Sequence, residues 1–354
     1  MGSCTTKISH QSEEPKKIIK ILSLKTPITS SPYQMLMFPS TPKPTSGALQ
    51  SFEAFGSYPS LIEEPFARKK IEVKGKPATE QFETADLAVI CHKGLKAEPN
   101  QDNFCVVSSA NGYFVGVFDG HGKDGHIISA LARKILVSKV ENLGISNIPE
   151  AFSLTNEEIL KRCKEKNADF EFSGCTATFA SIVNNELTLA YLGDSKALMI
   201  KSFQGQLIGC SLTVDHNTLN ALEKKRIQNA GGILSMNENE GLSRVTIPSS
   251  PLGLAITRSF GDEAFKNFGV ICTPTVEKIK LEPSDKFLVI ATDGVWDVIK
   301  NYEIAKVLEK FQGRNACERI SRIARNRWLE SGQNTVDDIT IAILSIGNIQ
   351  NSIV

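Results

Sequence analysis

The amino-acid sequence predicts an α+β fold, with antiparallel sheets at its centre and separate helices packed outside them. Two apolar, strand-like runs flank Asn184-Asn185, and this pattern is typical of a β-hairpin. Strand-like and helix-like segments follow one another without regular alternation, which argues against a parallel sheet built from βαβ units. With 354 residues, 41% of them hydrophobic, the chain can form one large domain or two small ones.

The first part of the globular region is expected to contain strands and two helices. Apolar runs of strand length occupy residues 87–91, 104–107 and 113–118. Apolar residues recur at helical spacing over 125–143, so a long helix is expected there. A second helix is expected over 155–166, where Thr155 can act as the N-cap and acidic residues follow it.

The second part begins with the hairpin and ends with two helices and a strand. The hairpin strands are expected over 175–183 and 187–192, and a helix over 218–230 ends at Gly231-Gly232. The remaining expected elements are a strand at 287–292, helices at 302–311 and 315–330, and a strand at 339–344.

Composition argues against several classes of protein. The formal net charge of +1 gives no reason to expect nucleic-acid binding. No apolar run approaches the roughly 18 residues expected of a membrane-spanning helix. The eight cysteines are scattered, with no Cys-x-x-Cys pair, and this favours a reduced, cytoplasmic compartment.

Residues 1–80 differ from the rest of the chain and are interpreted as a flexible tether, followed by one globular domain at 81–348. The stretch 25–46 contains five prolines among serines and threonines. Such a stretch cannot hold a helix or build a hydrophobic core.

The N-terminus carries a pattern that is typical of acylation. Gly2 follows the initiator Met, and Thr6 stands where the myristoylation pattern has Ser or Thr. One myristoyl chain binds a bilayer with only about 10⁴ M⁻¹, so stable anchoring needs a second signal. Palmitoylation of Cys4 would supply that signal, and the basic residues of this region are a weaker electrostatic alternative. The expected location is therefore cytoplasmic and membrane-associated; a chance occurrence of the short pattern is the alternative.

Aspartates stand at the ends of three buried strand-like runs. Asp119 follows the run 113–118, Asp293 follows the run 287–292, and Asp337 comes just before the run 339–344. One Asp-Gly at such a place is weak evidence, because Asp-Gly is a favoured turn dipeptide. Several anionic carboxylates that converge at one sheet edge need cations to neutralise them, so a site for a hard divalent metal is expected.

Seven short motifs occur along the chain and together carry a family resemblance. They are Asn100-Gln-Asp-Asn103, Val117-Phe-Asp-Gly-His-Gly122, Ser173-Gly-Cys-Thr-Ala177, Leu192-Gly-Asp-Ser-Lys196, Leu254-Ala-Ile-Thr-Arg-Ser-Phe-Gly-Asp262, Ala291-Thr-Asp-Gly-Val-Trp-Asp297 and Asp337-Asp-Ile-Thr340. Any one of them is weakly specific. In this order they closely resemble the metal-dependent protein phosphatase 2C family, over roughly residues 85–346.

The resemblance implies a four-layer αββα sandwich, in which two central antiparallel sheets are flanked by helices. It implies two Mg²⁺ or Mn²⁺ ions at one end, and hydrolysis of phosphoserine and phosphothreonine in phosphoprotein substrates by a water that bridges the two metals. Hard divalent ions prefer oxygen ligands, which fits the aspartates. Members of this family are usually monomeric, and no coiled-coil heptad in the sequence argues otherwise.

Motif positions imply the roles of single residues. Asp119 resembles the carboxylate that bridges the two metals, and the Gly120 carbonyl is expected to bind one of them. Asp293 and Asp337 match ligands of the other metal. His121 resembles the general acid that protonates the leaving Ser or Thr oxygen, and an imidazole suits that task. A structural histidine is the alternative.

Asp102 and Asp297 match carboxylates that hold metal-bound water, and Gln101 is expected to hold such a water as well. Two aspartates within the motifs are not expected to be metal ligands. Asp194 is expected in a turn, and Asp262 near the metals or in a flap segment.

Four features depart from the family's pattern. Gln101 stands where the family often has Glu, although its amide can still hold a metal-bound water. The expected phosphate-binding Arg is missing, and Lys96 is the candidate in its place, as a point charge and not a bidentate fork; a solvated surface lysine is the alternative. Only Glu171 or Asp169 lies near the position of a weaker third metal that some members carry. Asp338 stands where many members have Asn.

Two other functions remain open on the sequence alone. Gln101 and the missing Arg are compatible with a pseudophosphatase, which would use the same fold to dock a partner. A phosphohydrolase acting on small phosphates or nucleotides is the other alternative, although the chain lacks a phosphate-cradling Gly-rich Lys-Ser/Thr loop.

Overall fold

The computed structural model describes one folded unit, which starts near Ala48. Its described residues are 52–57, 64–74, 82–84, 86–96, 98–109, 112–237, 242–248, 250–332 and 335–347. None of the helices in this described part is long and apolar enough to cross a membrane. The predicted acylation sites Gly2 and Cys4 lie outside the described residues.

The first central sheet has seven strands, and every neighbouring pair is antiparallel. In spatial order they are β17 (Thr275–Lys280), β10 (Glu186–Leu192), β9 (Ala177–Val183), β6 (Gly112–Phe118), β5 (Asn103–Ser109), β1 (Phe52–Gly56) and β2 (Ile71–Val73).

The second central sheet has six strands, which are again all antiparallel. In spatial order they are β12 (Gln206–Ser211), β11 (Lys196–Phe203), β18 (Asp285–Ala291), β19 (Ile339–Ser345), β4 (Leu87–His92) and β3 (Phe82–Glu83).

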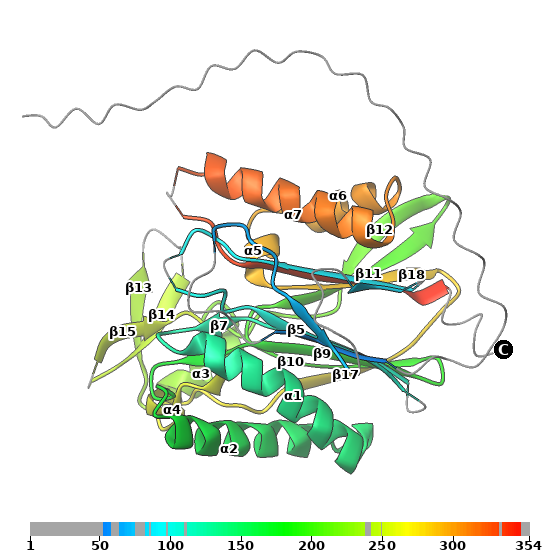
Figure 1. Ribbon diagram of the computed structural model, residues 1–354. Helices are drawn as coiled ribbons and strands as arrows, with labels where there is room; N and C mark the ends of the chain where they lie inside the picture. The colour runs from blue at the N-terminus through cyan, green and yellow to red at the C-terminus, as the bar shows by residue number, and fades with distance from the viewer. Residues whose placement is uncertain are drawn as a thin grey trace, which may run out of the picture. The chain divides into compact units, whose positions relative to one another are not determined.

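Helices cover the outer face of each sheet (Figure 1). On the seven-stranded side these are α1 (Gly125–Leu143), a short 3₁₀ turn (Ile145–Asn147) and α2 (Ile148–Lys166). On the six-stranded side they are α5 (Asp293–Trp296), α6 (Asn301–Leu308) and α7 (Gly313–Glu330). The predicted four-layer αββα sandwich is therefore confirmed.

Three apolar cores hold these layers together. Buried side chains such as Phe104 and Leu288 fill the space between the two sheets. Phe152 and Phe179 pack where α1 and α2 meet the first sheet, and Ile320 packs where α7 meets the second. Because both faces of each sheet are covered, most strands are apolar on both sides, which explains why they form continuous apolar runs in the sequence.

The predicted hairpin is confirmed at the residue level. Val183 pairs with Glu186 across the two-residue loop of Asn184 and Asn185. Both asparagines have positive φ angles, 48° and 62°. Asparagine tolerates this left-handed conformation better than most residues, so it suits a tight hairpin turn.

A smaller unit packs beside one end of the sandwich and has its own apolar core. It consists of α3 (Ala221–Asn229), a three-stranded sheet of β13 (Ile233–Asn237), β14 (Leu242–Ile247) and β15 (Ser250–Leu254), and α4 (Glu263–Lys266). A further small sheet lies at the same end and is made of three short strands, namely β7 (Gly120–His121), β8 (Gly174–Cys175) and β16 (Phe260–Gly261).

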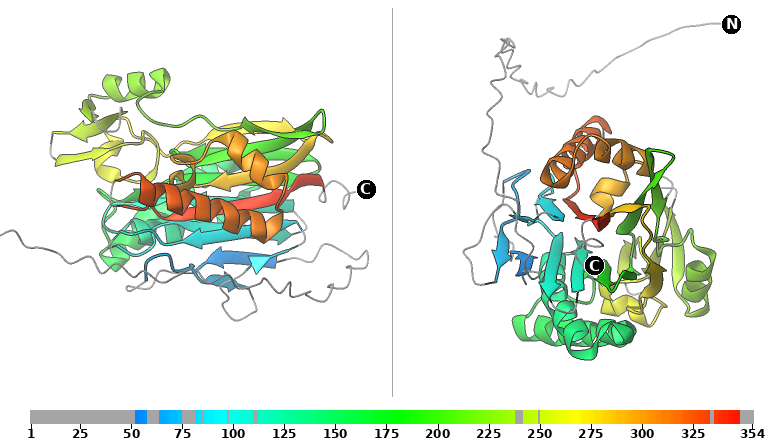
Figure 2. Two further views of the ribbon diagram at one scale, coloured as in Figure 1. Left: turned by 90° about the horizontal axis from the view of Figure 1, so that it is seen from above. Right: turned by 90° about the vertical axis from the view of Figure 1, so that its right-hand side faces the viewer.

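Two boundaries predicted from the sequence are wrong. The second helix starts at Ile148 and not at Thr155, because the Thr155 hydroxyl donates to the carbonyl of Ala151 inside the helix and does not cap its end. The folded region also starts before residue 81, because β1 pairs with β5 and Ala54 is fully buried. Figure 2 shows β1 and β2, in blue, at one edge of the molecule. The interpretation of the earlier residues as a tether remains a prediction.

Candidate active site

Three aspartates that are far apart in the sequence meet at one end of the sandwich. Asp119 follows β6 in one sheet, while Asp293 begins α5 after β18 and Asp337 precedes β19 in the other. All three line a cleft of about 400 Å³. The predicted convergence of strand-end carboxylates is therefore present in the structure.

The carboxylates of this cluster need positive charge nearby to be stable in their ionised form. Burial raises the pKa of Asp119 and of Asp293 well above the usual range, and the neighbouring carboxylates raise both further. An all-oxygen, anionic donor set of this kind fits Mg²⁺ or Mn²⁺. No group of three acidic, His or Cys side chains in the described part of the chain is arranged closely enough to hold an ion as it stands.

Gly120 lies in β7 between these aspartates and the start of α1. A Cβ atom at this position would lie 2.5 Å from the carbonyl oxygen of Gly125 and 2.7 Å from that of Gln101. Any side chain would therefore push the first turn of α1 away from the loop before β5. Only glycine allows this close approach of three backbone segments.

Asp102 is buried behind the cluster and is held by a hydroxyl group. Its Oδ2 accepts a hydrogen bond of 2.8 Å from Thr292, the residue before Asp293. Burial, and then the charge of Asp338, raise the pKa of Asp102 to about 7. The ammonium of the buried Lys69, which comes from the segment before β2, donates to the backbone carbonyls of Asn100 and Asp102. These contacts fix the position of Asp102 relative to both sheets.

Asp338 fastens the loop before β5 to the start of β19. Its two oxygens each accept a backbone N–H, from Gly94 and from Gln101, and both distances are 2.7 Å. Two N–H donors on two oxygens suit a carboxylate, whereas an Asn at this position would offer only one acceptor oxygen. This arrangement gives a physical reason for the Asp that departs from the family's pattern.

Gln101 lines the cleft, but its side-chain donor is engaged within the protein. The amide nitrogen donates to the carbonyl of Gly122 at 2.7 Å, and its backbone carbonyl accepts from Ser129 and Gly120. Gln101 thus supports the turn that carries Gly120 and His121. Its predicted contact with a metal-bound water stays a prediction.

His121 forms a pair that the sequence did not predict. Its Nε2 lies 2.8 Å from Oδ2 of Asp262, which is fully buried and also accepts a hydrogen bond from Ser259. Burial alone would raise the pKa of Asp262, but the charge and hydrogen bond of His121 outweigh it, so the pKa lies below its usual range. The other oxygen of Asp262 has no hydrogen-bond partner among the described residues.

The backbone explains how Asp262 reaches the histidine. Asp262 has a φ of 50°, Gly261 before it has a φ of 72°, and the Asp262 amide donates to the carbonyl of Ser173. This sharp turn after β16 points the carboxylate back toward β7. The Gly261-Asp262 pair, at the end of the motif that begins at Leu254, is the one local signal that could have indicated such a turn.

Asp194 and Asp297 extend the acidic surface. Asp194 lies in the turn between β10 and β11, as predicted, but its side chain also lines the cleft. Burial, and then the charges of Asp215 and Asp297, raise its pKa to about 6. Asp297, at the end of α5, is exposed and does not line the cleft. Asp194 is thus closer to the centre of the site than the sequence suggested.

Lys96 points into the cluster from the loop after β4. Its Nζ lies 2.5 Å from Oδ1 of Asp337. Burial alone would lower the pKa of Lys96, but Asp337, and then Asp119 and Asp293, raise it above its usual value. The ammonium therefore neutralises part of the carboxylate charge. The side chain is at the same time exposed, so its role as the phosphate-binding charge stays a prediction.

The acidic residues near the predicted third metal position are engaged in turns. Oδ2 of Asp169 accepts from the Ser173 hydroxyl at 2.6 Å, and its Oδ1 accepts from the amide of Glu171 at 3.1 Å. The Asp169 amide in turn donates to Asp124 at 2.7 Å. These contacts order the loop before β8.

Comparisons with known proteins agree on one family. The family model described as "Protein phosphatase 2C" matches residues 85–335. "Probable protein phosphatase 2C 61" of Arabidopsis thaliana is 34% identical over 253 residues, which cover 68% of this chain and 77% of the relative. "Probable protein phosphatase 2C 72" of the same plant is 32% identical over 256 residues, which cover 66% and 76%.

Solved structures share the fold. A serine-threonine phosphatase 2C from Toxoplasma gondii matches with a TM-score of 0.67 at 19% identity, over 75% of this chain and 96% of that one. A serine/threonine phosphatase from Staphylococcus aureus matches with a TM-score of 0.55 at 18% identity, over 75% and 97%.

Proposed function

The chain belongs to the protein phosphatase 2C family, and from this premise we propose that it hydrolyses phosphoserine and phosphothreonine in proteins with the help of divalent cations bound at Asp119. The observation that carries the proposal is that Asp119 from one sheet lines the same cleft as Asp293 and Asp337 from the other, and that burial raises the pKa of Asp119 and Asp293. Buried carboxylates that raise one another's pKa are stabilised by cations.

The proposed metal ligands are Asp119, the Gly120 carbonyl, Asp293 and Asp337, and they would hold two Mg²⁺ or Mn²⁺ ions. Asp102, Gln101 and Asp297 would hold water around the ions. Bound divalent cations would make water more acidic and offset charge on the phosphoryl oxygens. The protein's own part is to hold the ligands rigidly, and the Asp102–Thr292 and Asp338–Gly94 hydrogen bonds do this.

His121 is the proposed general acid. A protonated imidazole can give its proton to the Ser or Thr oxygen as the bond to phosphorus breaks. Asp262 supports this role, because its carboxylate stabilises the imidazolium form and orients the ring through Nε2. With Nε2 facing Asp262, Nδ1 is the ring nitrogen left for the leaving group.

Lys96 is the proposed point charge for a phosphoryl oxygen. It lines the same cleft as Asp119 and His121, and it is drawn there by Asp337. A flexible ammonium that pairs with a carboxylate in the absence of substrate can turn to a phosphate oxygen a few ångströms away.

A divalent cation should bind, stabilise and activate the protein. Adding Mg²⁺ or Mn²⁺ to metal-free protein is expected to raise the melting temperature by roughly 5 °C or more, if the cation is present at about a hundred times its Kd. The same addition should start phosphate release from a phosphothreonine peptide, and EDTA should reverse both effects. The measurements are thermal unfolding and phosphate release on the same samples.

The alternative function is a pseudophosphatase that docks a partner. It is favoured by the Lys96–Asp337 ion pair, which places an ammonium group where a cation would help. Folded protein that shows neither a thermal shift nor phosphate release with either metal would support this alternative and contradict the proposed catalysis.

We also propose that the protein is a cytoplasmic monomer attached to membranes through a myristoyl group on Gly2 and a palmitoyl group on Cys4. The support is the N-terminal sequence pattern alone. Expressed in cells with a labelled myristate, the protein is expected to incorporate the label, and Gly2→Ala should lose it and move to the soluble fraction. Cys4→Ser should keep the label but bind membranes more weakly. An unlabelled wild-type protein would contradict the proposal.

A further inference from the structure

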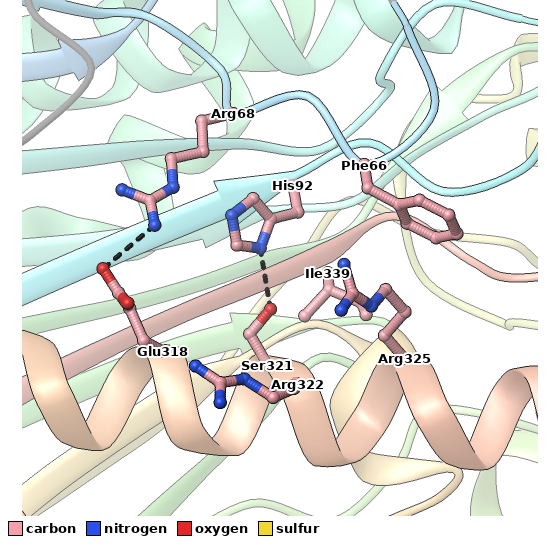
Figure 3. A pocket seen from close by; sticks show the side chains of 8 residues that line it. All are labelled: Phe66, Arg68, His92, Glu318, Ser321, Arg322, Arg325 and Ile339. Atoms are coloured by element: carbon pink, nitrogen blue, oxygen red, sulfur yellow. Dashed lines mark hydrogen bonds and ion pairs between the residues drawn. The ribbon is translucent and has the colours of Figure 1, made fainter. Parts of the chain in front are cut away.

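A second cavity lies between the six-stranded sheet and α7. It has a volume of about 250 Å³ and shares none of its lining residues with the active-site cleft described above. Figure 3 shows that Ile339 of β19 lies beside polar side chains that come from three other parts of the chain. Phe66 and Arg68 precede β2, His92 ends β4, and Ser321, Arg322 and Arg325 belong to α7.

The cavity is strongly basic. Three arginines line it, Arg68, Arg322 and Arg325, against one carboxylate, Glu318, so the formal charge of its walls is 3 − 1 = +2. Glu318 lies 2.9 Å from Arg68 and also pairs with Arg314. No carboxylate in the described part of the chain forms an ion pair with Arg322 or Arg325. Their guanidinium groups are thus available to an anion from outside.

One of these guanidinium groups is held in place before any ligand binds. The Arg325 guanidinium carbon lies 5.0 Å from the centre of the Phe66 ring, which is a cation–π contact. Phe66 has a φ of 62°, an uncommon conformation for a bulky residue. The fold thus keeps Phe66 in a costly conformation in which its ring supports Arg325.

The imidazole of His92 lies in the positive potential of the cavity, and burial and this potential both lower its pKa. Its Nδ1 lies 2.7 Å from the Ser321 hydroxyl. Burial, and then the charges of Arg68 and Arg325, lower the pKa of His92 to about 4. The imidazole is therefore neutral at physiological pH, so the positive charge of the cavity comes from its arginines.

We propose that this cavity binds a phosphate group, carried by a phosphorylated protein side chain or present as inorganic phosphate. A phosphate monoester carries about −1.5 to −2 charges near pH 7, which matches the +2 of the walls. A ligand with a single carboxylate carries one negative charge, so it would leave half of the +2 charge of the walls unbalanced. Planar guanidinium groups also bind phosphate oxygens through paired hydrogen bonds, which a lysine cannot do.

The inference goes beyond the proposed catalysis, because this phosphate would be bound and not hydrolysed. The described residues around the cavity contain no cluster of carboxylates for a cation, since Glu318 is the one acidic residue that lines it. For an enzyme that acts on phosphoproteins, as proposed above, such a site would hold a second phosphorylated residue, apart from the one that is cleaved.

The test is a calorimetric titration of metal-free protein near pH 7, so that cations do not draw phosphate to the active site. The probes are a short peptide with one phosphoserine, the same peptide with Ser or Glu in its place, and inorganic phosphate. The double variant Arg322→Gln/Arg325→Gln is expected to weaken binding of the phosphopeptide at least tenfold. The matched control is Arg319→Gln, an exposed arginine of the same helix that does not line the cavity, and it should change the Kd less than twofold.

Each outcome decides one point. Binding of the phosphopeptide, with competition by phosphate, supports a protein-borne ligand, whereas binding of phosphate alone supports the free ion as the source. Equal binding by the double variant, or equal binding of the Glu peptide, would overturn the proposal. Turnover of a phosphothreonine peptide is measured separately with metal, and its absence alongside intact phosphate binding would count against the proposed catalysis alone.

A second measurement does not depend on any variant. Phosphate placed among the arginines offsets their charge on His92, so the pKa of His92, followed by NMR of the imidazole, should rise when phosphate saturates the protein. An unchanged pKa of His92 at saturating phosphate would also overturn the proposal.

Discussion

Asp119→Asn is expected to remove phosphatase turnover almost completely while the protein stays folded. The substitution keeps the shape of the side chain but takes away the charge that is proposed to hold both cations. Losing several kcal/mol of transition-state stabilisation corresponds to a decrease in rate of roughly 10³-fold or more. The measurement is phosphate release from a phosphothreonine peptide with Mn²⁺ or Mg²⁺, and Asp293→Asn should behave in the same way.

The fold itself should tolerate this change well. In metal-free protein, Asp119 is partly buried close to Asp293 and both pKa values are raised, so a neutral amide removes a repulsion. The urea midpoint of metal-free Asp119→Asn is therefore expected at or above that of the wild type. The matched control is Glu186→Gln, which should keep full activity. Glu186 is exposed at the start of β10, at the end of that strand opposite to Asp194. Wild-type turnover in Asp119→Asn would contradict the proposed role of Asp119.

His121→Ala is expected to lower turnover of a phosphothreonine peptide by about 10²–10⁴-fold, which is the usual contribution of a general acid. The loss should be small with p-nitrophenyl phosphate, because a nitrophenolate leaves without needing a proton. Comparing kcat on the two substrates separates loss of the acid from loss of binding or of fold. Equal losses on both substrates would contradict the general-acid role.

Asp262→Asn tests the pair that only the structure revealed. An amide in place of the carboxylate cannot stabilise the imidazolium, and a general acid must be protonated to act. The alkaline limb of the kcat against pH profile should therefore move to lower pH for the peptide substrate. Turnover of p-nitrophenyl phosphate should change little. A peptide profile identical to that of the wild type would mean that Asp262 supports the loop and not the histidine.

Local patterns were sufficient to predict much of the framework. The spacing of apolar residues over 125–143 predicts a helix, and α1 spans the same residues, Gly125–Leu143. Asn184-Asn185 between two apolar runs predicts the hairpin, and the observed pairing of Val183 with Glu186 confirms it. These predictions are correct because periodicity and turn preference depend on neighbours along the chain.

Sequence patterns predicted the structure less well where an element is stabilised by residues that are distant in the sequence. β1 and β2 are short and carry little apolar periodicity. They become strands because β1 pairs with the edge of β5, and β2 then pairs with β1. Thr155 has the chemistry of a cap, yet it lies inside α2 because Ile148 and Phe152 bury the helix's first turns against the sheet. In both cases tertiary packing outweighs local preference.

The sequence by itself determined that aspartates stand at strand ends, in an order that identifies the protein phosphatase 2C family. Only the tertiary structure decided which side chains touch: His121 with Asp262, 141 residues away, and Lys96 with Asp337, 241 residues away. It also decided that arginines from α7 and from the segment before β2 surround one cavity. The physical reason is that sequence patterns report neighbours along the chain, whereas the electrostatics of a site depend on charges that folding brings within a few ångströms of one another.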